Sequence, residues 1–166
     1  MSQATDTRET LWDLIKDIRF GMFTTRHTNG LMHSRPMTAQ NKSIDESATL
    51  YFFASKTGEL AADIAADSSV GVSFSDTGKD SYVGIGGQAR FVEDQAKKEA
   101  LWTPMAAAWF PGGVKDPDLG LIEVTMTKAE YWDVKENKAT QLLKMAKAAV
   151  TGKPPSMGEH KEVNLH

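Results

Sequence analysis

The 166-residue sequence contains no cysteine, which excludes disulfide bonds, thiolate catalysis and zinc–thiolate sites. It has no hydrophobic run long enough to cross a bilayer, and residues 1–9 are too polar to form the core of a signal peptide. The net charge of −3 does not indicate the basic surface typical of nucleic-acid-binding proteins. We therefore expect a cytoplasmic protein with no nucleic-acid or membrane partner.

Several motifs of catalysis and cofactor binding are also missing. The spacing of the four histidines, His27, His33, His160 and His166, is not that of metal ligands, so no metal site is predicted. No glycine-rich loop followed by Lys-Ser/Thr and no Gly-x-Ser-x-Gly motif is present. The glycine-rich segment 84–87 lies within an expected strand and favours a bulge over a dinucleotide-binding loop. The catalytic residues stay unknown, because no side chain is identified as an acid, base or nucleophile.

What the chain does contain is a regular succession of strands and amphipathic helices. Hydrophobic periodicity predicts helices over residues 7–18, 58–67, 94–109 and 138–150. Strands are predicted over residues 20–25, 31–40, 50–54, 70–75, 81–92 and 119–133. The first three strands follow one another without intervening helices, which favours an α+β fold with a mainly antiparallel six-stranded β-barrel and flanking helices. Residues 1–150 are expected to form a single domain, followed by an extended C-terminal tail over residues 151–166.

The helix predicted over residues 138–150 is basic and amphipathic. Its apolar positions Leu142, Met145, Ala146 and Ala149 are expected to face the core, while its lysines face solvent. Binding of this helix to a membrane surface is an alternative interpretation.

The strand over residues 31–40 carries the first candidate binding residues. Strand alternation places Arg35 and Met37 on one face, with Thr38 and Gln40 on the other. Pro36 removes one backbone donor and indicates an edge or a bulge, where free backbone groups can meet a ligand. Arg35 either pairs with an anion or is a solvent-facing side chain on an edge strand.

A second candidate segment is the strand end Phe53-Ala54 with the polar turn Ser55-Lys56-Thr57. A helix begins directly after this turn, and a helix N-terminus with a nearby lysine can bind an anion. The alternative is a plain helix cap with Thr57 as the N-cap residue, and Glu59 in the first turn favours that alternative by repelling phosphate.

Trp109 and Trp132 are candidates for stacking on a ring, although tryptophans in such positions are more often part of the core. Together, these segments can hold a flat, partly apolar, phosphorylated ligand. FMN is the first candidate.

The order and spacing of these motifs resemble the general stress protein branch of the pyridoxamine 5′-phosphate oxidase-like, FMN-binding split-barrel family. The resemblance extends from the first helix to Val150. The matching segments are Ser34-Arg35-Pro36-Met37-Thr38, Phe52-Phe53-Ala54-Ser55-Lys56, Gly87-Gln88-Ala89, Leu101-Trp102, Trp109-Phe110-Pro111-Gly112-Gly113, Asp116-Pro117 and Glu130-Tyr131-Trp132-Asp133.

This resemblance implies a split-barrel homodimer that holds two FMN molecules at the subunit interface, with FAD as a second candidate cofactor. It implies that Arg35 reaches the phosphate and that the backbone of residues 37–40 meets the flavin edge. Residues 53–57 are then expected to lie against the ribityl phosphate. Trp132 is expected to approach the ring from the partner subunit, with Trp109 near the same place.

Two departures from the family pattern bear on function. Glu59 and Leu60 stand where family members often carry a basic residue, and Lys56 is the nearest replacement. Residues 134–137 replace the substrate motif with Arg and His that follows this strand in pyridoxamine phosphate oxidases. The sequence therefore predicts a flavin-dependent oxidoreductase of the general stress type that lacks this substrate site. The alternatives are a non-catalytic flavin-binding or regulatory protein and a structural barrel without a cofactor.

Overall fold

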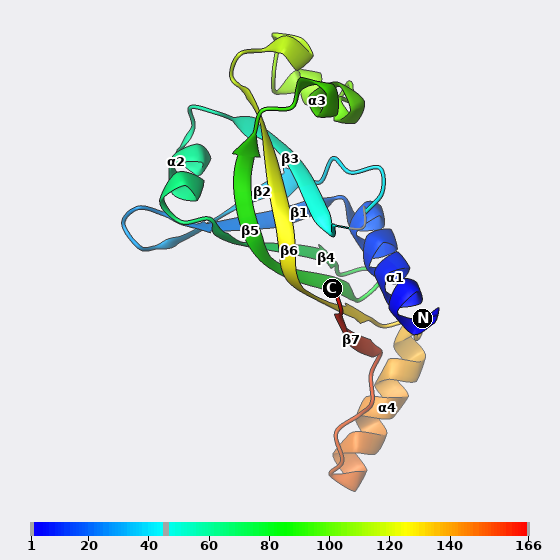
Figure 1. The fold of residues 1–166 in the computed structure, drawn as a ribbon. Coiled ribbons are helices and arrows are strands. Elements are labelled where there is room, and N and C mark those ends of the chain that lie inside the picture. The colour runs from blue at the N-terminus through cyan, green and yellow to red at the C-terminus, as the bar shows by residue number, and fades with distance from the viewer. Residues whose placement is uncertain (1, 45–46, 166) are drawn as a thin grey trace.

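The computed structural model describes residues 2–44 and 47–165 and shows helices around one curled antiparallel sheet (Figure 1). The helices are α1 (Ser2–Ile18), α2 (Glu59–Ala66), α3 (Gln95–Leu101) and α4 (Lys138–Thr151). The strands are β1 (Phe20–Arg26), β2 (Met32–Thr38), β3 (Thr49–Ser55), β4 (Ser69–Asp76), β5 (Ser81–Val92), β6 (Leu119–Asp133) and β7 (Glu159–Val163). Their order in the sheet is β2-β1-β4-β5-β6-β3, and β7 also pairs with β6.

The sheet curls toward a barrel that stays open between its two end strands. In the described part of the chain, no strand ladder joins β2 to β3. The contact between them includes one backbone hydrogen bond, from Gln40 N–H to the carbonyl of Tyr51 at 2.8 Å, just after β2 ends. This arrangement confirms the prediction of an α+β split barrel.

A bulge helps the long strand β5 to curve against β6. The register between the two strands shifts between Gly86 and Gly87, as the glycine-rich segment predicts. A Cβ atom at Gly87 would lie 2.6 Å from the carbonyl oxygen of Thr125, so only glycine allows this close approach.

The core lies inside the curl and is closed on one side by α1. Phe23 of β1 and Phe52 of β3 meet edge to face, with ring centroids 5.1 Å apart. Leu11 and Ile15 of α1 are buried in the same cluster, which confirms the apolar face predicted for this helix. Burial of such a side chain is worth about 1.5–3 kcal/mol, so α1 is tied firmly to the sheet.

The predicted helix over residues 94–109 is wrong in its second half. α3 ends at Leu101, and two short 3₁₀ helices follow at Ala106–Ala108 and Gly113–Lys115. Pro104 explains the break, because proline has no N–H to donate and keeps the preceding residue out of the helical conformation.

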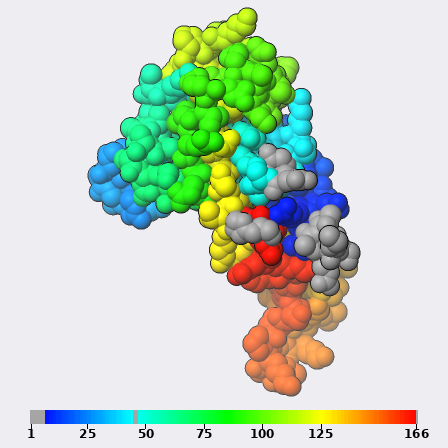
Figure 2. Space-filling view, in the orientation of Figure 1, coloured from blue at the N-terminus to red at the C-terminus, as the bar shows by residue number. Residues whose placement is uncertain are grey.

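Helix α4 forms where it was predicted, but its environment is not the predicted one. Asn137 caps its first turn by accepting a hydrogen bond from Thr140 N–H, and Gly152 ends it in the left-handed conformation. The helix projects away from the barrel, and none of its residues is buried (Figures 1 and 2). The expectation that its apolar positions face the core is therefore wrong: Leu142, Met145, Ala146 and Ala149 are all exposed.

The C-terminal segment includes a strand that the sequence did not reveal. β7 pairs with residues 129–133 of β6, beyond the stretch 119–125 of β6 that pairs with β3. The tail is therefore joined to the sheet by a ladder of its own. Among the described helices, none is long and apolar enough to cross a membrane.

Candidate functional site

A pocket of about 660 Å³ lies at the split of the barrel. Its walls come from the end of α1, from residues 36–42 on and after β2, from Phe53 and Ala54 of β3, and from residues 103–110. Seen along the chain, these are four separate segments. Closure of the sheet brings them together.

The pocket collects many of the residues singled out from the sequence. Those lining it are Pro36, Met37, Thr38, Gln40, Phe53, Ala54 and Trp109. Phe53, Phe110 and Trp109 provide aromatic walls, and Trp109 is 83% exposed at the rim. Trp109 is therefore not a core residue, which was the alternative reading of its position.

The strand that borders the pocket is an edge strand, as Pro36 predicts. Among the described strands, β2 pairs with β1 alone, with Pro36 opposite Met22. A proline can be accommodated on such an edge because no second ladder requires its missing N–H. Backbone groups along the outer edge of β2 are thus available to a ligand in the pocket.

The polar turn after β3 lies just outside the pocket and already contacts a carboxylate of the protein. Thr57 donates to Asp118 Oδ1 from its backbone N–H at 3.2 Å and from its hydroxyl at 2.9 Å. Hydrogen bonds from Ser55 and then from Thr57 lower the pKa of Asp118. Lys56 pairs with Glu93 at 2.6 Å. The interpretation of Thr57 as the N-cap residue of α2 is wrong, because that position is taken by Gly58 without a side-chain cap.

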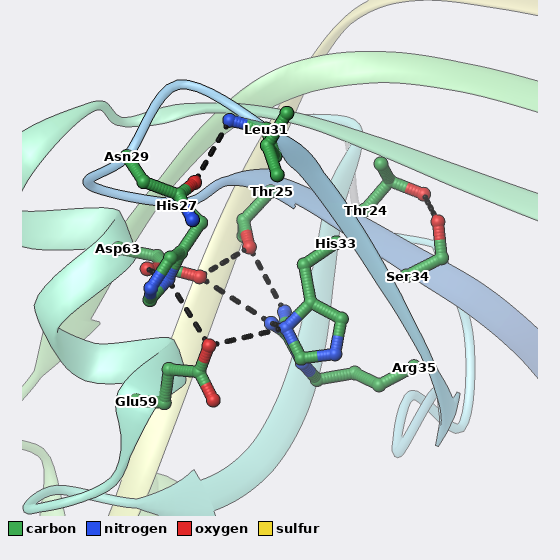
Figure 3. Close-up of polar contacts among 10 residues, drawn as sticks. All are labelled: Thr24, Thr25, His27, Asn29, Leu31, His33, Ser34, Arg35, Glu59 and Asp63. Atoms are coloured by element: carbon green, nitrogen blue, oxygen red, sulfur yellow. Dashed lines mark hydrogen bonds and ion pairs between the residues drawn. The ribbon is translucent and has the colours of Figure 1, made fainter.

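Arg35 is paired with an anion, but that anion is a buried aspartate of the same chain (Figure 3). Its guanidinium lies 3.3 Å from Asp63 Oδ2 and donates to the Thr25 hydroxyl at 3.0 Å. It also lies 2.8 Å from His33 Nδ1. The Asp63 side chain is fully buried and that of Arg35 is 19% exposed, so the solvent-facing alternative for Arg35 is wrong.

The surroundings of Asp63 keep it charged. Burial alone would raise its pKa, but hydrogen bonds from Thr25 and His27 and the charges of His27 and Arg35 lower the pKa below its ordinary value. Asp63 therefore joins α2 to the β1–β2 hairpin as an ion.

Trp132 lies in a different place from the pocket of its own chain. It is on β6, where its ring stacks on that of His160 of β7 with centroids 4.8 Å apart and planes 2° apart. Its side of the barrel carries β7 and α4 (Figure 1). A role at the pocket would require the Trp132 of a second subunit.

The pocket also includes cations that sequence reasoning missed. Lys16 and Arg19 at the end of α1 and Lys42 after β2 are among its lining residues. Arg19 follows the helix with a φ of 66°, an unusual left-handed conformation for a residue other than glycine. No local pattern identifies these three residues, because α1 meets the loop after β2 only in the folded chain.

Comparison with known proteins agrees with this fold. A family model described as pyridoxamine 5′-phosphate oxidase like matches residues 6–156, so the chain belongs to this family. The general stress FMN/FAD binding protein of Xanthomonas citri is 32% identical, with 81% of this chain and 92% of that chain covered and a TM-score of 0.67.

Two further relatives extend this comparison. A protein described as general stress protein 26 from Jannaschia sp. CCS1 is 29% identical, with 96% and 99% of the two chains covered and a TM-score of 0.74. Protein bli-3 of Neurospora crassa is 27% identical over 158 residues, which cover 88% of this chain and 74% of bli-3. The general stress protein resemblance predicted from the sequence motifs is thereby confirmed.

Proposed function

We propose that the protein binds a flavin, FMN in the first place and FAD as the second candidate, in the pocket at the split of the barrel. The observation that carries this proposal is the pocket of about 660 Å³ with aromatic walls beside the free edge of β2. Pockets of about 300–1,000 Å³ with mostly apolar walls and a few polar groups are typical of cofactor sites. The similarity to the Xanthomonas citri protein, named for binding FMN/FAD, supports the same ligand.

The residues of the pocket fit the parts of a flavin. Phe53, Met37 and Trp109 offer apolar contact to a flat ring, and the backbone from Pro36 to Gln40 offers polar groups to its edge. A bound flavin supplies the redox chemistry, while the protein holds, orients and shields it. We further propose that the protein is a cytoplasmic flavin-dependent oxidoreductase of the stress response, which steady oxidation of a reduced nicotinamide would support. A bound flavin without turnover would favour the non-catalytic alternative.

The phosphate of FMN has two candidate positions. At the first, Arg35 directly precedes the lining residues of β2, and Ser55, Lys56 and Thr57 directly follow those of β3; we propose that these four residues hold the phosphate. Because Asp63 pairs with Arg35 and Glu93 with Lys56, this position has little uncompensated positive charge.

The cations that line the pocket are the second candidate. They are Lys16, Arg19 and Lys42, and Lys16 is paired with Asp13 at 3.1 Å. Replacing the cation that binds the phosphate should weaken FMN binding by roughly tenfold to a hundredfold and leave riboflavin binding little changed. We expect this loss for Arg35→Ala and not for Arg19→Ala or Lys42→Ala. A loss in Arg19→Ala or Lys42→Ala without a loss in Arg35→Ala would instead assign the phosphate to the cations that line the pocket.

The first test of the proposal is an absorbance scan of the purified protein, with mass identification of any released chromophore. Titration with FMN, FAD and riboflavin should then give saturable binding. Ala54→Phe, which fills the pocket, should weaken all three ligands at least about tenfold. Ala139→Phe on the exposed α4 should not, and retained binding in Ala54→Phe would contradict the assignment of the pocket.

We also propose that the protein is a homodimer with the flavin at its interface. Large apolar side chains are exposed around the pocket: Trp109 at 83%, Phe20 at 60% and Met105 at 59%. Contiguous exposed apolar surface of this kind is typical of protein interfaces. Light scattering at low micromolar concentration should give the mass of a dimer, and a strictly monomeric protein that still holds FMN would contradict the shared site.

We expect no oxidation of pyridoxamine or pyridoxine phosphate by the flavin-loaded protein. Directly after Trp132 the chain offers Lys135 and Lys138 but no arginine, and lysine lacks the planar fork that binds phosphate in a bidentate manner. Both are engaged in ion pairs, Lys135 with Asp133 at 3.9 Å and Lys138 with Asp80. Assay of pyridoxal phosphate formation in air tests this expectation, and formation at ordinary enzyme rates would contradict it.

A further inference from the structure

Three potential metal ligands converge where the β1–β2 hairpin meets α2 (Figure 3). His27 directly follows β1 in the hairpin turn, and Glu59 and Asp63 lie one helical turn apart on α2. His27 Nδ1 is 2.8 Å from Asp63 Oδ1 and 3.0 Å from Glu59 Oε1. The ligand atoms of the three residues all lie within 4.8 Å of one another.

The arrangement leaves one proton to serve two carboxylates. A ring nitrogen carries at most one hydrogen, so His27 Nδ1–H has to be shared between the oxygens of Asp63 and Glu59. Two carboxylates held this close repel each other unless a cation lies between them. A divalent ion in place of the shared hydrogen would contact the imidazole nitrogen and both oxygens at once.

The surrounding groups hold the ligands in these orientations. Thr25 and Arg35 both donate to Asp63 Oδ2, which leaves Oδ1 for the His27 ring. The backbone of His27 is fixed in the hairpin by two bonds of 2.8 Å, one to Leu31 and one from Gly30. Such outer contacts, which orient the ligand atoms, are a regular feature of protein metal sites.

We propose that His27, Glu59 and Asp63 bind a divalent transition-metal ion, with Zn²⁺ as the best fit. One imidazole and two carboxylates form a nitrogen–oxygen ligand set that suits Zn²⁺. Bonds of about 2.0–2.1 Å in a tetrahedron separate the ligand atoms by about 3.3 Å. The two distances of 2.8 and 3.0 Å therefore have to open by only a few tenths of an ångström.

The fourth position of the site faces solvent. Glu59 is 52% exposed and His27 29% exposed, whereas Asp63 is fully buried. His33 Nδ1 lies within hydrogen-bond distance of the Arg35 guanidinium, so His33 is not assigned as a ligand. With Arg35 on the far oxygen of Asp63, the filled site carries one excess positive charge. Hydroxide or another anion at the open position balances it.

Calorimetric titration of the chelator-treated protein with Zn²⁺ tests the proposal, with Co²⁺ absorption as a spectroscopic readout of nitrogen–oxygen coordination. We expect one ion per chain and a loss of affinity of at least about tenfold in Glu59→Gln and in His27→Ala. Neither variant removes a fully buried side chain, and circular dichroism without metal checks that each is folded.

The pair His160–Glu130 is a matched control. His160 Nε2 and Glu130 Oε2 lie 3.1 Å apart, a distance similar to that between His27 and Glu59. Among the described residues, however, no third potential metal ligand completes a group with them. His160→Ala and Glu130→Gln should therefore leave Zn²⁺ affinity unchanged. Failure to bind Zn²⁺, unchanged affinity in Glu59→Gln and His27→Ala, or an equal loss in the control variants would each overturn the proposal.

Discussion

The pocket and the polar cluster beside it share strand β2 but differ in almost every physical respect. We define the polar cluster as Thr25, His27, Arg35, Glu59 and Asp63. Met37, two residues after Arg35, lines the apolar and aromatic pocket. Arg35 instead joins the hairpin to α2 through Asp63. Neighbouring residues of one strand thus line the pocket and form an ion pair that stabilises the fold.

The sequence motifs indicate that a flavin would be held largely through its phosphate by Arg35. The pairing of Arg35 with Asp63 weakens this interpretation. A cation whose charge is balanced by a buried carboxylate attracts a phosphate less than a free one does. A large part of the flavin affinity should therefore come from apolar and stacking contacts in the pocket, in addition to the phosphate contact proposed for Arg35. The polar cluster should determine stability and, by our proposals, phosphate and metal binding.

The largest expected effect is the loss of the buried carboxylate. Asp63→Ala leaves the mostly buried guanidinium of Arg35 without its counter-charge, so we expect the free energy of unfolding to fall by about 3–5 kcal/mol. Urea denaturation measures this change. Asp13→Ala removes an exposed pair with Lys16 and should cost less than about 1 kcal/mol. Equal effects would show that the polar cluster is no more important than a surface ion pair.

A substitution in the pocket should have the opposite effect to one in the polar cluster: it should weaken flavin binding and leave the stability of the fold unchanged. Trp109→Ala removes an aromatic wall that is 83% exposed, so the unfolding free energy should stay within about 0.5 kcal/mol. Loss of its ring contact should weaken flavin binding by about 1–2 kcal/mol, roughly fivefold to thirtyfold. Fluorescence titration measures the affinity. Unchanged binding together with a large loss of stability would reverse the contrast between the two regions.

The smallest effect is confined to acidic pH. Because the pKa of Asp63 in the folded protein is lowered from 3.8, its charge stabilises the fold above that pH. This stabilisation is lost as the pH falls through the folded-state pKa. The near-isosteric Asp63→Asn lacks this titration, so its stability deficit relative to the parent should be constant near neutral pH and shrink below about pH 4. Urea midpoints from pH 3 to 7 measure it, and a constant deficit over the whole range would mean that folding does not lower the pKa of Asp63.

The helices show which features of the fold can be predicted from sequence patterns and which cannot. α1 and α4 both have the apolar spacing of amphipathic helices. α4 forms where it was predicted, whereas α1 begins at Ser2, five residues before the predicted start at residue 7. Leu11 and Ile15 of α1 are buried, but Leu142 of α4 is 67% exposed. Periodicity identifies a helix and its apolar face, because both depend on nearby residues. It does not identify the surface against which that face packs.

The residues of the candidate site likewise fall into those that the sequence predicted and those that it did not. The motifs at Pro36–Gln40 and Phe53–Ala54 were predicted, and they lie together at the pocket. The contributions of Lys16, Arg19 and Lys42, and the meeting of His27 with α2, could not be predicted. Each depends on segments that are distant in sequence and adjacent only once the sheet has curled.

The sequence alone was sufficient for strands β1 to β6, the presence of helices α1 to α4, the edge position at Pro36, the bulge near Gly87 and the family resemblance. These features follow from local conformational preferences and short motifs. The tertiary structure decided that Arg35 pairs with Asp63, that α4 stands away from the barrel and that β7 extends the sheet beside β6. The physical reason is that charge pairing and burial depend on distances in space between groups far apart in the chain.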